Sequence, residues 1–129
     1  MNKLNLALYL TIICLAVFTS SCEKETINER KLEQMLANIK ALAASSVCDN
    51  NGTYQLKYIR YGTRECDGAG YLAYSTSIDV KNFENQVKKY NELEKAYLDK
   101  KNKGIDCLAI TIPPKSVTCE NGKPKLVYQ

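Results

Sequence analysis

Cysteine is the residue type whose number and spacing point most directly to chemistry in this chain. Six cysteines occur among 129 residues, and histidine is absent. Without histidine, neither a Ser-His-Asp triad nor a histidine-ligated metal site can form. The cysteines make no Cys-x-x-Cys pair, and this spacing also disfavours a metal site. We therefore expect no metal and no cofactor, and we interpret the cysteines as sites of lipid attachment and disulfide formation.

Cys22 lies directly after a short, mainly apolar segment at the N-terminus. Lys3 provides a positive charge, residues 4–18 are mainly apolar, and residues 19–21 are small. The apolar segment is too short to span a bilayer comfortably and is typical of a signal peptide. Its end resembles the lipobox of bacterial lipoproteins, with threonine where leucine is commoner. The resemblance implies that residues 1–21 are removed and that Cys22 carries the lipid that binds the protein to the membrane.

A polar tether follows at residues 22–28, with the sequence Cys-Glu-Lys-Glu-Thr-Ile-Asn. Its acidic residues resemble the surface-export signal of Bacteroidota lipoproteins. Any solvated tether is charged, however, and both interpretations stay open. We expect a lipid-anchored protein of the outer membrane, on the cell surface or on the periplasmic face.

Four cysteines remain beyond the tether: Cys48, Cys66, Cys107 and Cys119. An even number in a small exported domain predicts two disulfides. Three pairings are open, and we favour the local one, which joins Cys48 to Cys66 and Cys107 to Cys119. Each bond would stabilise the domain by roughly 3 kcal/mol through loop closure.

The charge balance argues against a nucleic-acid partner. Lys3 is the only charged residue of the first 21, so the net charge falls from +4 to +3 when they are removed. A nucleic-acid-binding domain would carry a basic stripe and a much higher pI. No residue pattern indicates a catalytic reaction either, so we expect a protein that is not an enzyme.

The spacing of apolar residues divides the remainder into two helices and several strands. Three- and four-residue spacing predicts helices over residues 26–44 and from a cap at Ser77 or Asp79 to residue 103. Alternation and aromatic content predict strands, namely residues 53–61, 71–75, 107–112, 116–120 and 123–128, with a hairpin turn at Asn121-Gly122. The fold class is therefore α+β, a small antiparallel sheet packed by two helices and stabilised by two disulfides. We expect one globular domain over residues 29–129.

The glycine-rich loop that follows the first strand is the candidate binding site. It is flanked by Arg60, Tyr61, Arg64 and Tyr71. Arginine and tyrosine often dominate protein interfaces, and a disulfide at Cys66 would stiffen the loop. The alternative is a tight connection whose tyrosines pack inward.

Several segments resemble small four-cysteine lipoprotein domains of Bacteroidota. Those domains carry a Gly-x-x-x-Cys-Gly-Gly-type loop, a Tyr-Ser-x-x-Ile-Asp helix start and a Cys-x-Asn-Gly end. The matching segments here are residues 62–68, 74–79 and 119–122, with aspartate at position 67 where the group has glycine. The resemblance implies a common fold with four paired cysteines, and it implies no catalytic residues.

These observations predict a non-catalytic binding module that uses residues 60–71 to contact a protein or a glycan. A protease inhibitor that presents Arg64 to a trypsin-like enzyme is one alternative. The other is a structural envelope lipoprotein without a specific ligand.

Replacing Cys22 by alanine removes the thiol that lipid attachment requires. We expect the Cys22→Ala variant to move from the membrane fraction to the soluble fraction when cells are fractionated and immunoblotted. Cys14→Ala, which lies within the apolar segment, is the matched control and should stay with the membrane. Continued membrane association of Cys22→Ala would contradict the lipid anchor.

Overall fold

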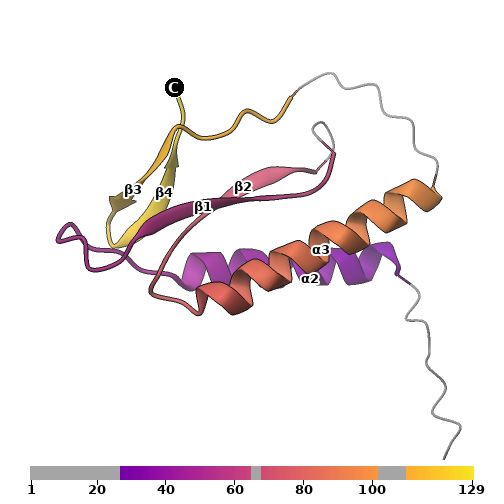
Figure 1. The fold of residues 1–129 in the computed structure, drawn as a ribbon, viewed down its shortest axis with the longest axis horizontal. Coiled ribbons are helices and arrows are strands. Elements are labelled where there is room, and N and C mark those ends of the chain that lie inside the picture. The colour runs from indigo at the N-terminus through magenta and orange to yellow at the C-terminus, as the bar shows by residue number, and fades with distance from the viewer. Residues whose placement is uncertain (1–26, 65–67, 102–109) are drawn as a thin grey trace, which may run out of the picture.

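The computed structural model describes residues 27–64, 68–101 and 110–129. It contains two helices and two antiparallel hairpins, and so belongs to the α+β class (Figure 1). No helix among the described residues is long and apolar enough to cross a membrane. In chain order the elements are α2 (Glu29–Ser45), β1 (Leu56–Tyr61), β2 (Gly70–Ser75), α3 (Val80–Lys100), β3 (Ser116–Glu120) and β4 (Lys123–Val127).

Both helices begin at a polar cap. The side chain of Asn28 accepts a hydrogen bond from the Lys31 N–H at 2.9 Å, and that of Asp79 accepts one from the Asn82 N–H at 3.0 Å. Such caps satisfy N–H groups that have no partner within the helix. The two helices are therefore confirmed, and of the two caps proposed for the second helix the structure selects Asp79.

The core lies between the helices and one face of the β1–β2 hairpin (Figure 1). Tyr74 of β2 is 2% exposed, and its ring packs on Phe83 of α3 at a centroid distance of 4.8 Å. Apolar residues at helical spacing supply the rest of the core because they fall on one face of each helix. The buried members of this core are Leu32, Ile39, Ala43, Tyr74, Phe83, Val87 and Tyr90.

The strands form two separate two-stranded sheets, whereas the sequence predicted one small sheet. In β1–β2, Leu56 lies opposite Ser75 and Tyr61 opposite Gly70; in β3–β4, Ser116 lies opposite Val127. The β3–β4 hairpin lies on the side of β1–β2 that faces away from the helices (Figure 1). It turns at Asn121-Gly122, as predicted, where both residues have positive φ. Of the strand predicted over 107–112, residues 110–112 are not a strand, and 107–109 lie outside the described residues.

One disulfide joins Cys48 to Cys119, so the local pairing favoured from the sequence is wrong. The chain returns after α3 and sets β3 beside the residues that follow α2, which brings the two Cα atoms within 5.8 Å. The bond spans 71 residues, and closing a loop of that length stabilises a fold by about 4 kcal/mol in the chain-entropy model. Cys66 and Cys107 lie outside the described residues, and a second disulfide stays a prediction.

The same hairpin also caps the C-terminal end of α2. The Lys123 ammonium donates to the carbonyl oxygens of Ala44 at 2.9 Å and Ser46 at 3.1 Å. Beside it, the Cys48 N–H donates to the Gly122 carbonyl at 3.0 Å. A cation at this end of a helix also interacts favourably with the helix dipole. Lys123 therefore holds the hairpin and the helix together by charge as well as by hydrogen bonds.

Replacing Lys123 by methionine keeps most of the side-chain volume and removes the charged donor. We expect Lys123→Met to lower the free energy of unfolding by about 1 kcal/mol, measured by urea denaturation. The control is Lys125→Met in the same strand, which removes only an exposed ion pair with Glu120 and should cost about 0.5 kcal/mol or less. Equal losses in the two variants would show that Lys123 does not act as a helix cap.

Candidate functional site

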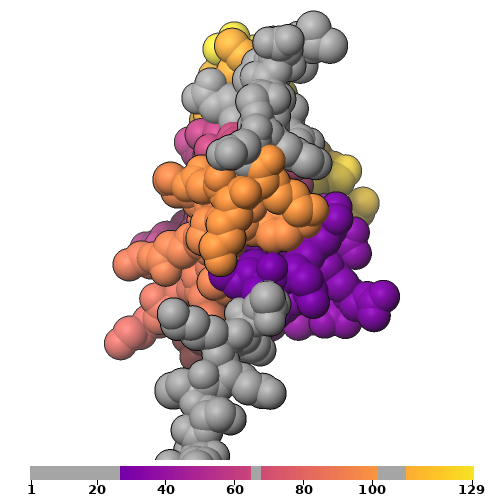
Figure 2. Space-filling view, turned by 90° about the vertical axis from the view of Figure 1, so that its right-hand side faces the viewer, coloured from indigo at the N-terminus to yellow at the C-terminus, as the bar shows by residue number. Residues whose placement is uncertain are grey.

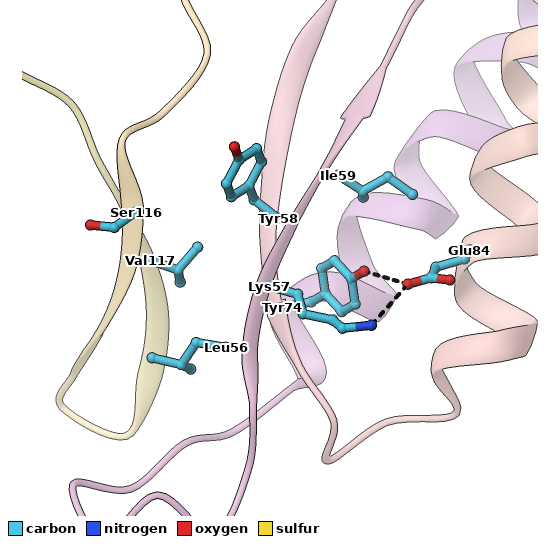
Figure 3. Close-up of a pocket in the computed structure, with 8 residues that line it drawn as sticks. All are labelled: Leu56, Lys57, Tyr58, Ile59, Tyr74, Glu84, Ser116 and Val117. Atoms are coloured by element: carbon cyan, nitrogen blue, oxygen red, sulfur yellow. Dashed lines mark hydrogen bonds and ion pairs between the residues drawn. The ribbon is translucent and has the colours of Figure 1, made fainter.

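Successive side chains along β1 and β2 point to opposite faces of the hairpin, and this divides the predicted binding residues between two faces. Ile59 and Tyr61 pack against the helical core, whereas Tyr58 and Arg60 belong to the opposite face because successive side chains alternate. Tyr71 lies opposite Arg60 in the register and shares that face. Figure 3 shows Tyr58 and Ile59 pointing to opposite sides of the strand. The structure thus brings Arg60 and Tyr71 together and separates them from Tyr61.

Tyr61 has a structural position. Its ring packs against the core, and the Lys40 ammonium lies 5.3 Å from the ring centroid. Its phenol covers Gly70 so closely that a Cβ atom at Gly70 would lie 2.6 Å from the Tyr61 oxygen. Glycine is needed at position 70 for this approach. For Tyr61, the placement agrees with the inward-packed alternative.

The outer face of the hairpin carries two tyrosines in contact. The rings of Tyr58 and Tyr71 meet edge to face at a centroid distance of 5.8 Å, and Tyr58 is 43% exposed. Arg60 follows Tyr58 by two residues and lies directly opposite Tyr71, and its Nε and Nη2 atoms are buried and have no hydrogen-bond partner among the described residues. We call Tyr58, Arg60 and Tyr71 the tyrosine face. It combines tyrosine and arginine, two of the residue types that are enriched among the strongest contacts of protein interfaces.

Two polar residues of α3 hold the start of the glycine-rich loop. Asn91 accepts the Gly62 N–H at 2.8 Å and donates to the Arg60 carbonyl at 3.5 Å. Glu94 accepts the Thr63 N–H at 2.7 Å and the Thr63 hydroxyl at 3.0 Å through the same carboxylate oxygen. Three backbone groups of residues 60–63 are therefore bonded to one helix, which fixes the direction in which the loop leaves β1.

Glu94 is a buried carboxylate, only 7% exposed. Its second oxygen accepts the Tyr90 hydroxyl at 3.3 Å. Burial, and then the charge of Glu94, raise the pKa of Tyr90 above its usual range, so this phenol stays protonated and acts as a donor. With both oxygens occupied, the carboxylate has a positioning role toward the loop.

Asn91 and Glu94 were not recognised from the sequence, although one signal was present. Glu94 follows Tyr90 by four residues and precedes Tyr97 by three, and both tyrosines belong to the apolar seam of α3. A glutamate on that seam must be buried and must find partners. The partners are at the other end of a hairpin, so only the tertiary structure identifies them.

The far end of the loop is bordered by exposed apolar side chains. The two ends of the loop lie close together, because a Cβ atom at Gly62 (φ 82°), at the near end, would lie 2.6 Å from the Cα of Ala69, at the far end. The Thr111 hydroxyl donates to the Ala69 carbonyl at 3.5 Å, and its neighbours Ile110 and Ile112 are 68% and 71% exposed. Arg64 is half-buried, and residues 65–67 lie outside the described part of the chain.

A groove of about 650 Å³ runs along β1 between β3 and α3 (Figure 3). One wall is apolar and consists of Leu56, Tyr58 and Val117. The other wall is polar: Glu84 accepts the Tyr74 hydroxyl at 2.6 Å and lies 3.6 Å from the Lys57 ammonium. Burial first, and then Glu84, raise the pKa of Tyr74 above its usual range. The groove can therefore contact apolar groups on one side and hydrogen-bonding groups on the other.

The described residues contain no group of three or more cysteine, aspartate or glutamate side chains that could hold a metal ion. Asn91 and Glu94 hold the loop, and Lys57, Tyr74 and Glu84 line the groove. The arrangement is therefore suited to binding through hydrogen bonds and apolar contact. Comparison of the chain with protein families, with curated proteins and with solved structures finds no match.

Replacing Glu94 by alanine leaves the Thr63 N–H and the Tyr90 hydroxyl without their acceptor. We expect Glu94→Ala to lower the free energy of unfolding by about 2 kcal/mol and to speed hydrogen exchange at the Thr63 amide. Glu92→Ala, two residues away on the exposed side of α3, should change stability by about 0.5 kcal/mol or less. Unchanged exchange at Thr63 in Glu94→Ala would contradict the anchoring role.

Proposed function

We propose that this protein is a lipid-anchored lipoprotein of the bacterial outer membrane that acts as a non-catalytic binding module. The apolar N-terminal segment that ends at Cys22 supports the lipid anchor. The partner is a protein or a glycan of the envelope or its surroundings. The tyrosine face and the adjoining loop make the contact.

The observation that carries this proposal is the attachment of residues 60–63 to α3. Asn91 and Glu94 hold Gly62 and Thr63 by three hydrogen bonds of 2.7–3.0 Å. A segment that is ordered before binding loses less conformational entropy when a partner binds. Burying a carboxylate costs free energy, and a loop that only connects two strands does not need one. A buried Glu94 is well suited to holding the loop in one conformation.

The chemistry of the surface agrees with this role. Tyr58 and Tyr71 offer two ring edges and two hydroxyl groups, and the exposed Ile110 and Ile112 add apolar area at the other end of the loop. Tyrosine buries a large area at a small entropic cost, which is why paratopes use it heavily. Tyr61 supports the core instead, so Tyr71 is the residue to test.

The test compares affinity-tagged variants in intact cells after chemical cross-linking. We expect a specific partner to be recovered with the wild type and to fall by about tenfold or more with Tyr71→Ala. Tyr128→Ala is the matched control, because Tyr128 is an exposed tyrosine near the C-terminus that lies outside the tyrosine face. This variant should retain the partner. Folding of each variant is checked by its thermal transition.

Two other results would replace the proposal. If all variants recover the same neighbours in the same amounts, the protein is a structural lipoprotein without a specific ligand. If the purified protein inhibits trypsin stoichiometrically and Arg64→Ala does not, it is a protease inhibitor. External protease treatment of intact cells, set against a periplasmic control protein, then shows which side of the membrane the partner must occupy.

A further inference from the structure

β1 has one edge without a neighbouring strand. Within the part of the chain that the structure describes, it pairs only with β2. Just before β1, the Thr76 N–H donates to the carbonyl of Gln55, the residue directly opposite, at 3.0 Å. Hydrogen-bonded and non-hydrogen-bonded pairs alternate along an antiparallel ladder. Counting from this pair, Leu56, Tyr58 and Arg60 direct their backbone N–H and C=O groups away from β2.

The contacts of Asn91 confirm this direction. Its side-chain amide donates to the Arg60 carbonyl and accepts the Gly62 N–H, two groups on the outward edge. A residue of a neighbouring parallel strand would bond to the same two groups. Asn91 thus occupies the edge at the end of β1. At Leu56 and Tyr58, no hydrogen bond to the outward backbone groups is found within residues 27–64, 68–101 and 110–129.

Leu56 and Tyr58, which carry these open groups, both line the groove. Four consecutive residues of β1, 56–59, line it, which is the pattern of a strand seen along its edge (Figure 3). A strand placed there would point alternate side chains toward the apolar wall at Tyr58 and Val117. The other side chains would meet Lys57 and Glu84, which already neutralise each other at 3.6 Å.

Among the described residues, this edge lacks the usual protection of an exposed strand. Natural edge strands are commonly blocked by proline, by lysine or by a covering segment. β4 follows that rule, with Pro124 between Lys123 and Lys125. β1 has no proline, and its lysine, Lys57, lies beside Glu84 on the helical side of the strand. An open edge in a walled groove is suited to strand addition.

We propose that the groove binds an extended peptide segment of a partner protein, which adds as a strand to β1. The segment carries apolar residues at alternate positions and small uncharged polar residues between them, because the polar wall has no net charge to match. A second copy of this domain fits poorly, because its own β3 and α3 would meet the walls of the groove. This inference rests on the proposed binding function and names the class of partner.

The probe is a set of short synthetic peptides in which valine, isoleucine, leucine or tyrosine alternates with threonine or serine. Binding to the purified mature protein is followed by fluorescence anisotropy and by the backbone amide resonances of the isotope-labelled protein. We expect binding with shifts at Leu56 and Tyr58. Two N-methylated versions of a binding peptide are compared, one methylated at the odd-numbered and one at the even-numbered backbone nitrogens. Only the version that loses the N–H donors facing β1 should bind about tenfold more weakly.

Variants of the protein test the same hydrogen bonds by removing the backbone N–H groups of β1 that the peptide would contact. Tyr58→Pro removes an outward N–H without removing a hydrogen bond to β2, and it should abolish peptide binding. Tyr58→Ala keeps the N–H and should only weaken binding. Ala73→Pro removes an outward N–H on the opposite edge and is the matched control that should still bind.

Three results would overturn the inference. The first is that no peptide of the set shifts Leu56 or Tyr58, while the envelope partner is still lost in Tyr71→Ala; the proposed function then stands without strand addition. The second is equal binding of both N-methylated registers. The third is a dimer in light scattering that Tyr58→Pro dissociates, which would assign the edge to a second copy. If the envelope partner also proves absent, the proposed function itself fails.

Discussion

Each sheet has two strands among the residues that the structure describes, so neither sheet would be stable alone. An isolated two-stranded hairpin is marginal in water and must be packed against something else. β1–β2 is packed by the helices through Tyr74 and Phe83, whereas β3–β4 is bonded to the end of α2 by Cys48–Cys119 and Lys123. The residues between α2 and β1 are thus the point at which all layers meet. The buried Ser75 of β2 donates to the Val47 carbonyl and so ties β2 to the same residues.

α3 has two roles on adjacent stripes of its surface. Its apolar stripe, with Phe83, Val87 and Tyr90, forms much of the core. Its polar residues Asn91 and Glu94 accept hydrogen bonds from the backbone N–H groups of residues 62 and 63, just after β1 ends. The helix thereby occupies the outward backbone groups at the end of β1. The geometry of residues 60–63 and the packing of the core are consequently coupled through one helix.

Local patterns predicted much of the fold. The apolar spacing of α3 and the Asn121-Gly122 turn depend on residues close in sequence, and the structure confirms them. The cap of α3 was predicted at Ser77 or Asp79, and the structure has it at Asp79. The disulfide partner of Cys48 and the acceptors of the loop depend on contacts across 71 and about 30 residues, which no local pattern specifies. The split between Tyr61 and Tyr71 could be anticipated in part, since alternation separates neighbours. Which face was buried depended on where the helices packed.

The Cys48–Cys119 bond makes residues 48–119 a covalent ring that contains β1, β2 and α3. A single backbone cleavage inside that ring opens it without separating two fragments, because the cystine still joins them. The nicked chain would keep its full mass until a reductant is added. A molecule cut once in a loop of this ring would therefore keep its N- and C-terminal portions connected.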